Sequence, residues 1–286
     1  MTGGAPREDV LRRLATAAVL VPLFLVAVVL GGLWFLAAVM ALSAVAAWEF
    51  FGMAAARGYR PRAVAGIGLA LAFPAALEAS TRRPDLLPAF LLAAIFGVAM
   101  AHLLDPEADG AIASVAVTVT GAAWVGLSFG HLVLLREVPS RTPGMPDWFG
   151  ALLVAVPILL TWANDTVAYF VGHRWGRRRL LPRVSPGKSV EGALGALIAT
   201  VVLAFPVLWA VNVWVRLFDP LDALAVGVLI GVAAPCGDLV ESAFKRDAGV
   251  KDSSRLIPGH GGVLDRFDSL LVTAPVFYYY VHWIVH

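Results

Sequence analysis

Polar residues that could bind a metal ion or a phosphate gather between residues 238 and 268 of an otherwise apolar chain. The spacing of Asp238, Glu241, Ser242 and Lys245 is i, i+3, i+4, i+7, so an expected helix carries all four on one face. A loop with further charges and a glycine-rich turn follows them. Carboxylates are ligands that Mg²⁺ prefers, and cations bind phosphates. The stretch therefore predicts a site for phosphate chemistry.

The loop after this helix supplies a second candidate metal ligand and one histidine. Asp265, together with Asp238, offers hard oxygen ligands, and Mg²⁺ usually completes its shell with water and substrate phosphates. The glycines around His260 let the backbone approach a ligand closely. No second histidine lies nearby, so a hydrogen bond from His260 to a phosphate or to the backbone is favoured over metal binding. The simpler alternative is an ordinary basic loop after a helix with some polar residues.

The composition places these residues in an integral membrane protein. Of the 286 residues, 59% are hydrophobic and 15% are charged, and the mean hydropathy is +0.80, which is outside the range of soluble domains. A net charge of +2 is too small to indicate nucleic-acid binding. The single cysteine, Cys236, excludes an intramolecular disulfide and a multi-cysteine metal site.

A transmembrane helix needs about 20 apolar residues. The chain has about nine apolar stretches of roughly this length, which predict an all-α fold, a polytopic bundle of about nine transmembrane helices. We divide it into about five N-terminal helices, residues 1–145, and a C-terminal catalytic region, residues 146–286. Gly31 and Gly32, between the first two stretches, predict a tight helical hairpin. The stretches lie near residues 14–30, 33–51, 63–80, 86–104, 111–135, 148–172, 193–215, 221–245 and 267–286.

The basic residues predict the orientation of the bundle. With a cytoplasmic N-terminus, 17 of the 22 lysines and arginines lie on the cytoplasmic side, as the enrichment of basic residues in cytoplasmic loops requires. Two polar loops, residues 173–192 and 246–266, then face the cytoplasm, and we expect a multi-pass protein of the cell (inner or plasma) membrane. The basic residues on the side opposite the cytoplasm are Arg82, Arg83, Arg136, Arg141 and Arg216.

Acidic residues inside apolar helices are costly unless they are paired, hydrated or bound to a cation. Glu49 and Glu78 lie near expected helix ends, and we favour a position at the membrane interface for both. Asp165 and Asp238 each lie about seven residues from the cytoplasmic end of their helices, which places both roughly 10 Å below the surface. This matched depth predicts that Asp165 and Asp238 share a site.

The polar segment between residues 164 and 192 contains several cations. Lys188 and the run Arg177–Arg179 are suited to contact phosphates. The simpler alternative is a basic loop that anchors to anionic lipid headgroups, at about 1 kcal/mol per charge. That alternative does not explain Asn164 and Asp165 inside an expected helix.

Two blocks of the sequence resemble the conserved motifs of the phosphatidate cytidylyltransferases, also called CDP-diacylglycerol synthases. The resemblance assigns no functional role to residues 1–145. Ser189 replaces a more usual threonine, and Val167 a smaller residue. The first block matches at Ser242, Phe244, Lys245, Arg246, Lys251, Asp252, Ser254, Ile257, Pro258, His260, Gly261, Gly262, Val263, Asp265, Arg266, Phe267 and Asp268, and the second at Asp165, Tyr169, Gly172, Ser185, Pro186, Lys188, Glu191 and Gly192.

The resemblance implies a membrane-embedded, Mg²⁺-dependent condensation of CTP with phosphatidic acid to CDP-diacylglycerol and pyrophosphate, for phospholipid biosynthesis. Asp238 and Asp265 would hold Mg²⁺, with a second cation bridging the phosphates. Asp165 would support the metal or orient a cationic side chain. The lipid phosphate is already anionic near pH 7, so cations matter more than a strong base.

The resemblance also implies the other members of the site and the partners. The partners are CTP, phosphatidic acid and the lipid bilayer, without nucleic acid, and a homodimer stays open. Four of the cations, Lys245, Arg246, Lys251 and Arg266, would hold the triphosphate and the leaving pyrophosphate. The catalytic candidates are Asp238, Asp265, Lys245, Arg246 and Asp165, and the substrate-binding candidates are Lys188, Ser185, Ser242, Lys251, His260, Gly261, Gly262, Arg266 and Asp268.

Two other functions are compatible with parts of this pattern. A CTP-dependent polyprenol or phytol kinase would transfer the γ-phosphoryl group and release CDP in place of pyrophosphate. An ion-coupled transporter would use Asp165, Asp238 and Glu241 as a proton or cation path. Against the transporter, the polar residues cluster at one depth, and no inverted repeat is visible in the sequence.

The predicted orientation can be tested with single cysteines at Ser140 and Ser253 in a Cys236→Ala background. An impermeant thiol reagent applied to intact cells should modify the Ser140→Cys protein and spare the Ser253→Cys protein, because the basic loop faces the cytoplasm. The opposite labelling pattern would invert the topology.

Overall fold

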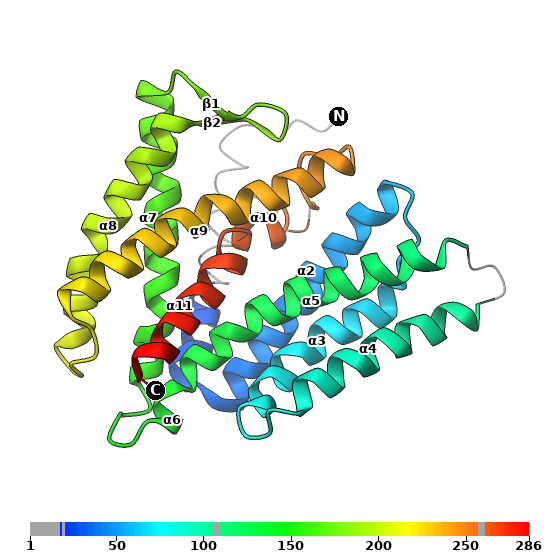
Figure 1. Cartoon of the computed structure of the whole chain (residues 1–286), viewed down its shortest axis with the longest axis horizontal. Helices are drawn as coiled ribbons and strands as arrows, with labels where there is room; N and C mark the ends of the chain where they lie inside the picture. The colour runs from blue at the N-terminus through cyan, green and yellow to red at the C-terminus, as the bar shows by residue number, and fades with distance from the viewer. Residues whose placement is uncertain (1–17, 19–20, 106–108, 255, 257–260, 286) are drawn as a thin grey trace. The chain divides into compact units, whose positions relative to one another are not determined.

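The computed structural model describes residues 18, 21–105, 109–254, 256 and 261–285 (Figure 1). The secondary structure of these residues is helical apart from one two-stranded sheet, which confirms the all-α prediction. The chain divides into two compact units, Met1–Val133 with Asp247–Phe267, and Leu134–Arg246 with Asp268–His286. These units follow chain packing, and the proposed functional division at residue 145 stays a prediction.

Seven helices are long and apolar enough to cross a membrane, and each coincides with one of the predicted spans. Their number indicates a multi-pass membrane protein. The orientation of the bundle stays a prediction. The seven helices are α2 (Gly32–Ala56), α3 (Ala63–Ser80), α4 (Leu86–Leu103), α5 (Ala111–Arg136), α7 (Phe149–Trp175), α8 (Val190–Asn212) and α9 (Pro220–Asp247).

The other two predicted spans are shorter in the described part of the chain. Within the first, 14–30, the structure has an apolar helix at Val21–Leu30, and most residues before it lie outside the described ones. The last corresponds to α11 (Leu270–Val285). Its 16 residues extend for about 24 Å, which is less than the roughly 30 Å of a hydrocarbon core.

The predicted hairpin between the first two apolar stretches is confirmed. Gly31 and Gly32 have φ angles of 64° and 49°, in the left-handed region that glycine adopts without a steric penalty. The turn brings the two helices together, so that the rings of Phe24 and Phe35 lie 5.9 Å apart in an edge-on contact.

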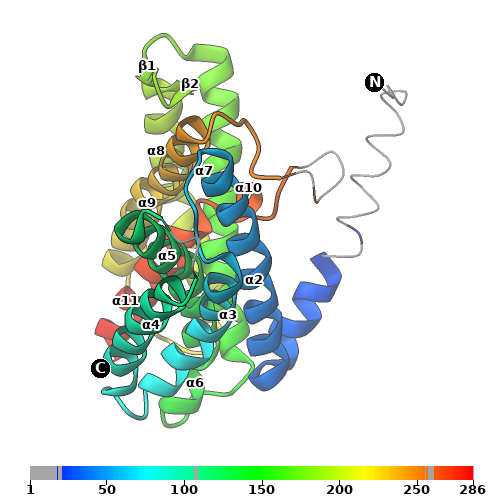
Figure 2. The same cartoon turned by 90° about the vertical axis from the view of Figure 1, so that its right-hand side faces the viewer.

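The first unit is a bundle in which α2 packs on α3, and α3 on α4 (Figure 2). Helix α5 approaches α2 and α3 closely because glycines face them. A Cβ atom on Gly126 would lie 2.7 Å from the carbonyl oxygen of Ala70, and one on Gly121 would overlap the ring of Phe50. The short helix α10 (Leu264–Phe267) packs against α2 at the end of the loop that follows α9.

In the second unit, buried polar contacts tie α7 to its neighbours. The Asn164 side-chain amide donates to the hydroxyl of Thr200 on α8 at 2.9 Å and to the carbonyl of Gly231 on α9 at 3.4 Å. The hydroxyls of Thr161 on α7 and Thr273 on α11 lie 2.9 Å apart. Such pairs satisfy polar groups that apolar surroundings would otherwise leave unpaired. They fix α7 against three helices.

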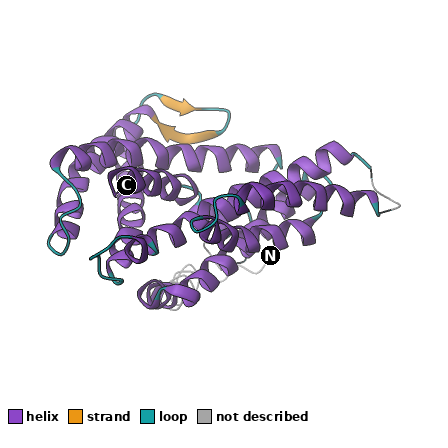
Figure 3. Ribbon diagram, turned by 60° about the horizontal axis from the view of Figure 1, so that its bottom comes forward, coloured by secondary structure: helices purple, strands orange, loops and turns teal. Residues whose placement is uncertain are grey.

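Residues 173–192, predicted as a loop, contain an antiparallel hairpin of β1 (Arg179–Leu181) and β2 (Ser185–Ser189). It extends from the adjoining ends of α7 and α8 (Figure 1), and its two strands are the orange arrows in Figure 3. The Ser189 hydroxyl accepts from the backbone N–H of Gly192 at 3.1 Å and caps α8. The Glu191 carboxylate accepts from the N–H groups of Arg177 and Arg178, at 2.9 and 3.1 Å. These contacts define where β2 leads into α8.

Candidate active site

Three carboxylates of the second unit form a cluster that could hold a metal ion. Asp238 and Glu241 lie one turn apart on α9, and Asp268 lies just before α11. One oxygen of each carboxylate lies within 4.8 Å of those of the other two. Glu241 is fully buried, and the other two are half-buried. Helical spacing predicts Glu241 on the same polar face as Asp238, but Glu241 was not among the predicted site residues.

A glycine before Asp238 allows the helix to approach the start of α11. A Cβ atom on Gly237 would lie 2.5 Å from the carbonyl oxygen of Asp268 and 2.8 Å from the Cα atom of Ser269. The backbone N–H of Ser269 donates to the Asp268 carboxylate at 2.6 Å. Because the two backbones pack directly on each other, the Asp268 side chain lies beside the polar face of α9.

Two lysines pair with this cluster. The Nζ atom of Lys188, on β2, lies 2.5 Å from an Asp238 carboxylate oxygen, and that of Lys245 lies 2.5 Å from a Glu241 oxygen. The Ser242 hydroxyl donates to the other Asp238 oxygen at 3.0 Å. The hairpin therefore positions Lys188 beside Asp238, so the structure brings the polar segment 164–192 to the polar face of α9.

Asp165, on α7, belongs to the same group of charges. It lies close enough to Asp238 and Lys188 to interact electrostatically with both. Matched depth along two helices predicts this proximity. The structure thus places Asp165, Asp238, Lys188, Lys245 and Ser242 in one region of the second unit. Their roles in a site stay predictions.

The charges of this group suit a divalent cation. The cluster and Asp165 provide four carboxylates against the two lysines, which leaves an excess of negative charge when all are ionised. A Mg²⁺ ion prefers such hard oxygen ligands and would stabilise their ionised forms. The donor set therefore fits this metal.

Asp265, the second predicted metal ligand, lies in the first unit and organises its own loop. Its carboxylate accepts from the backbone N–H groups of Ser253 at 2.9 Å and Gly262 at 2.7 Å, and from the Ser253 hydroxyl at 2.9 Å. The neighbouring Gly261 has a φ angle of 80°, which favours glycine. The metal-binding role of Asp265 stays a prediction.

Glu49, for which we favoured an interfacial position, is buried against a loop, and its depth in the membrane stays a prediction. Glu49 is only 2% exposed. Its carboxylate accepts hydrogen bonds from the hydroxyls of Ser253 and Ser254 and from the backbone N–H groups of Val263 and Leu264. The apolar stretch around it and its place near a helix end gave no sign of these partners, because they are more than 200 positions away. The Glu78 carboxylate, by contrast, lies 3.9 Å from a guanidinium nitrogen of Arg82.

The remaining candidates are distributed over both units. Arg246 donates from Nε to the carbonyl of Val184 at 3.2 Å and so contacts the turn of the hairpin. Ser185 begins β2 and is half-buried. Lys251 and Arg266 are exposed in the first unit. The predicted substrate contact His260 lies outside the described residues.

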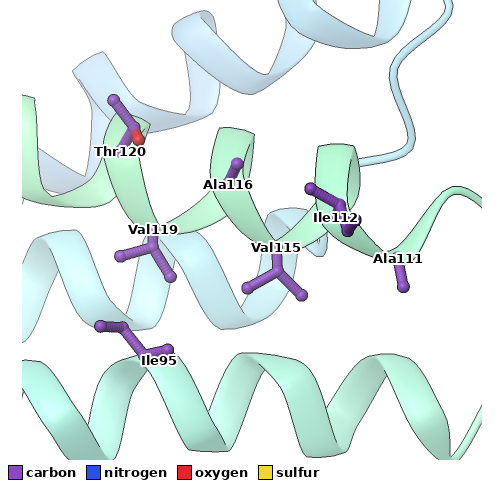
Figure 4. A pocket seen from close by; sticks show the side chains of 7 residues that line it. All are labelled: Ile95, Ala111, Ile112, Val115, Ala116, Val119 and Thr120. Carbon is purple, nitrogen blue, oxygen red and sulfur yellow. The ribbon is translucent and has the colours of Figure 1, made fainter.

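A cavity of about 480 Å³ in the first unit has different chemistry (Figure 4). None of the candidate site residues that the structure describes lines it, and only Thr120 among its lining residues has a polar side chain. Such a lining suits hydrocarbon and offers no charge to a triphosphate. The lining residues are Ile95, Ala111, Ile112, Val115, Ala116, Val119 and Thr120.

Comparisons with known proteins point to one family. Residues 11–284 match the Cytidylyltransferase family. Phosphatidate cytidylyltransferases of Synechocystis sp. and Pseudomonas aeruginosa are 34% and 35% identical to the chain, over 94% and 93% of its length and 96% and 94% of theirs. The uncharacterized protein YnbB of Escherichia coli is 40% identical over 67% of this chain, but the match spans only 62% of the E. coli protein, less than two thirds of its length.

The contact of Lys188 with Asp238 predicts a kinetic effect that a lipid-anchoring lysine would not show. Lys188→Ala should lower kcat/KM, measured at varied CTP and phosphatidic acid, by about 10- to 150-fold. This loss is the equivalent of roughly 1.5–3 kcal/mol for a charge-assisted contact. Lys188→Arg should restore only part, because a planar guanidinium does not replace a compact ammonium. Steady-state kinetics on variants with confirmed membrane insertion provide the test. An alanine variant within about twofold of wild type would leave Lys188 as a lipid anchor.

Proposed function

We propose that this chain, which belongs to the Cytidylyltransferase family, condenses CTP with phosphatidic acid to give CDP-diacylglycerol and pyrophosphate. The observation that carries the proposal is the cluster of Asp238, Glu241 and Asp268, paired with two lysines in a unit of apolar helices. The names of relatives matched over nearly the whole chain support the same substrates. A membrane protein with such a site suits one lipid substrate and one phosphate-rich substrate.

In the proposed reaction, a phosphate oxygen of phosphatidic acid attacks the α-phosphorus of CTP. A phosphorus–oxygen bond forms to the lipid phosphate as the bond between the α-phosphorus and the bridging oxygen to the β-phosphate breaks, and pyrophosphate leaves with the electron pair. The nucleophile is already anionic, so the site must mainly position two anions and offset their repulsion. Lys188 and Lys245 lie at the carboxylate cluster, and their positive charges would offset this repulsion.

Asp238, Glu241 and Asp268 would hold Mg²⁺ in this proposal, and the sequence-based prediction of Asp265 as a ligand stays part of it. The ion would neutralise charge on the phosphates and on the leaving group. The protein side chains have separate tasks. Ser242 orients the Asp238 carboxylate by its hydrogen bond, and Glu241 holds the ammonium group of Lys245. The fixed carboxylates therefore also determine where the cationic side chains lie.

The activity can be tested with purified protein in detergent, radiolabelled CTP, phosphatidic acid and Mg²⁺. CTP labelled in the cytidine should give a chloroform-soluble labelled product, with one pyrophosphate released per product molecule. Release of CDP with a phosphorylated lipid would instead identify a CTP-dependent lipid kinase. Absence of both products, with the protein folded, would contradict an enzymatic function with these substrates.

The proposed metal carboxylates should each be indispensable. Asp238→Asn or Asp265→Asn should lower turnover by at least about 100-fold, because each removes a charge that neutralisation of the phosphates depends on. Asp147→Asn is a matched control, since Asp147 is exposed and outside the site. Near-normal kcat in either site variant, measured over a range of Mg²⁺ concentrations, would remove that carboxylate from the proposed machinery.

A further inference from the structure

Glu49 is a buried carboxylate on α2 that binds a loop distant in the sequence. Its Oε1 atom accepts from the Ser254 hydroxyl at 2.6 Å and from the backbone N–H of Val263 at 2.9 Å. Its Oε2 atom accepts from the Leu264 N–H at 2.7 Å and the Ser253 hydroxyl at 3.1 Å. The donors lie 204 to 215 positions from Glu49. All four belong to the segment between α9 and α10 or to the first residue of α10.

These neutral donors explain how the carboxylate is tolerated. A carboxylate buried among apolar side chains is strongly destabilised unless it is paired or hydrogen-bonded. Among the described residues, no lysine or arginine lies within salt-bridge distance of Glu49. Neutral donors of the loop therefore stabilise its charge. In return, the carboxylate satisfies two backbone N–H groups that need an acceptor when buried.

A second carboxylate fixes the same loop from within. The Ser253 hydroxyl lies within hydrogen-bond distance of both Glu49 and Asp265. A hydroxyl has one hydrogen, so it donates to one carboxylate at a time. Gly262 closes the arrangement, because a Cβ atom there would lie 2.5 and 2.6 Å from the two Glu49 oxygens. The described residues on both sides of this loop are thus tied to the two carboxylates.

We propose that Glu49 is a positioning residue that holds Asp265 and the backbone around Gly262 in the conformation required for nucleotide use. The inference rests on the proposed function, in which Asp265, Gly262 and Arg266 serve the metal and the triphosphate. It gives α2 a role in the reaction, although the family resemblance assigns none to residues 1–145. Glu49 itself acts through the loop.

The first test is Glu49→Gln, which keeps the shape of the side chain but replaces one acceptor oxygen with an NH₂ donor. Hydrogen exchange of a peptide covering residues 261–267 should become about 10-fold faster or more, while exchange elsewhere in α2 and the melting temperature stay near those of wild type. The kcat/KM for CTP should fall by about 10-fold or more, as expected for lost hydrogen bonds to a charged acceptor.

Two further variants separate loop positioning from a general effect on folding. Glu78→Gln makes the same chemical change on α3 and should stay within about twofold of wild type in both measurements. Ser254→Ala removes one donor from the loop side and should lower kcat/KM less than Glu49→Gln. The double variant Glu49→Gln/Ser254→Ala should be little worse than Glu49→Gln alone, because the two residues share one interaction.

The outcomes distinguish the role of Glu49 from the proposed activity. Unchanged exchange at residues 261–267, or a kcat/KM within twofold of wild type, would overturn the positioning role. A uniform rise in exchange across α2 would also overturn it, since that result marks a residue needed for folding. If the wild-type protein made no CDP-diacylglycerol, the proposed function would fail by itself, and local exchange in Glu49→Gln would still decide whether Glu49 fixes the loop.

Discussion

The burial of ionised carboxylates in a protein of apolar helices is the constraint on which both polar regions depend. In the second unit, the solution is opposite charge, because Lys188 pairs with Asp238 and Lys245 pairs with Glu241. The β1–β2 hairpin contributes to this pairing, because β2 places Lys188 next to the Asp238 carboxylate on α9. A carboxylate inside a membrane helix is costly unless it is paired. The need to pair Asp238 therefore accounts for the position of the hairpin lysine.

The first unit meets the same constraint with neutral donors. Glu49 accepts hydrogen bonds from two backbone N–H groups and two hydroxyls, and charge-assisted bonds of this kind are stronger than neutral ones. Salt bridges leave flexible side chains free to exchange partners, whereas bonds to backbone groups fix the course of the chain. The two solutions therefore suit different tasks, with side-chain ion pairs at the carboxylate cluster and hydrogen bonds to backbone N–H groups at Glu49.

The sequence predicted those features that depend on local pattern. Helix α3, at Ala63–Ser80, has the bounds expected from its apolar length, and the depths of Asp165 and Asp238 indicated their proximity. The hairpin was not predicted, because strands of three and five residues have no clear periodicity. The hydrogen-bond partners of Glu49 were not predicted for a different reason. Its environment is made by residues more than 200 positions away, which no local pattern reveals.

The choice of cation at the cluster adds a further physical argument. The chain has only three lysines among its 22 basic residues, yet both cations paired with the carboxylates are lysines. A guanidinium binds a carboxylate through a rigid planar fork, while an ammonium is compact and carries three donors on a flexible stem. In the proposed reaction the phosphates change position and charge as pyrophosphate leaves. Lys188 and Lys245 can follow such changes by rotation, whereas arginines at the same positions would favour one fixed geometry.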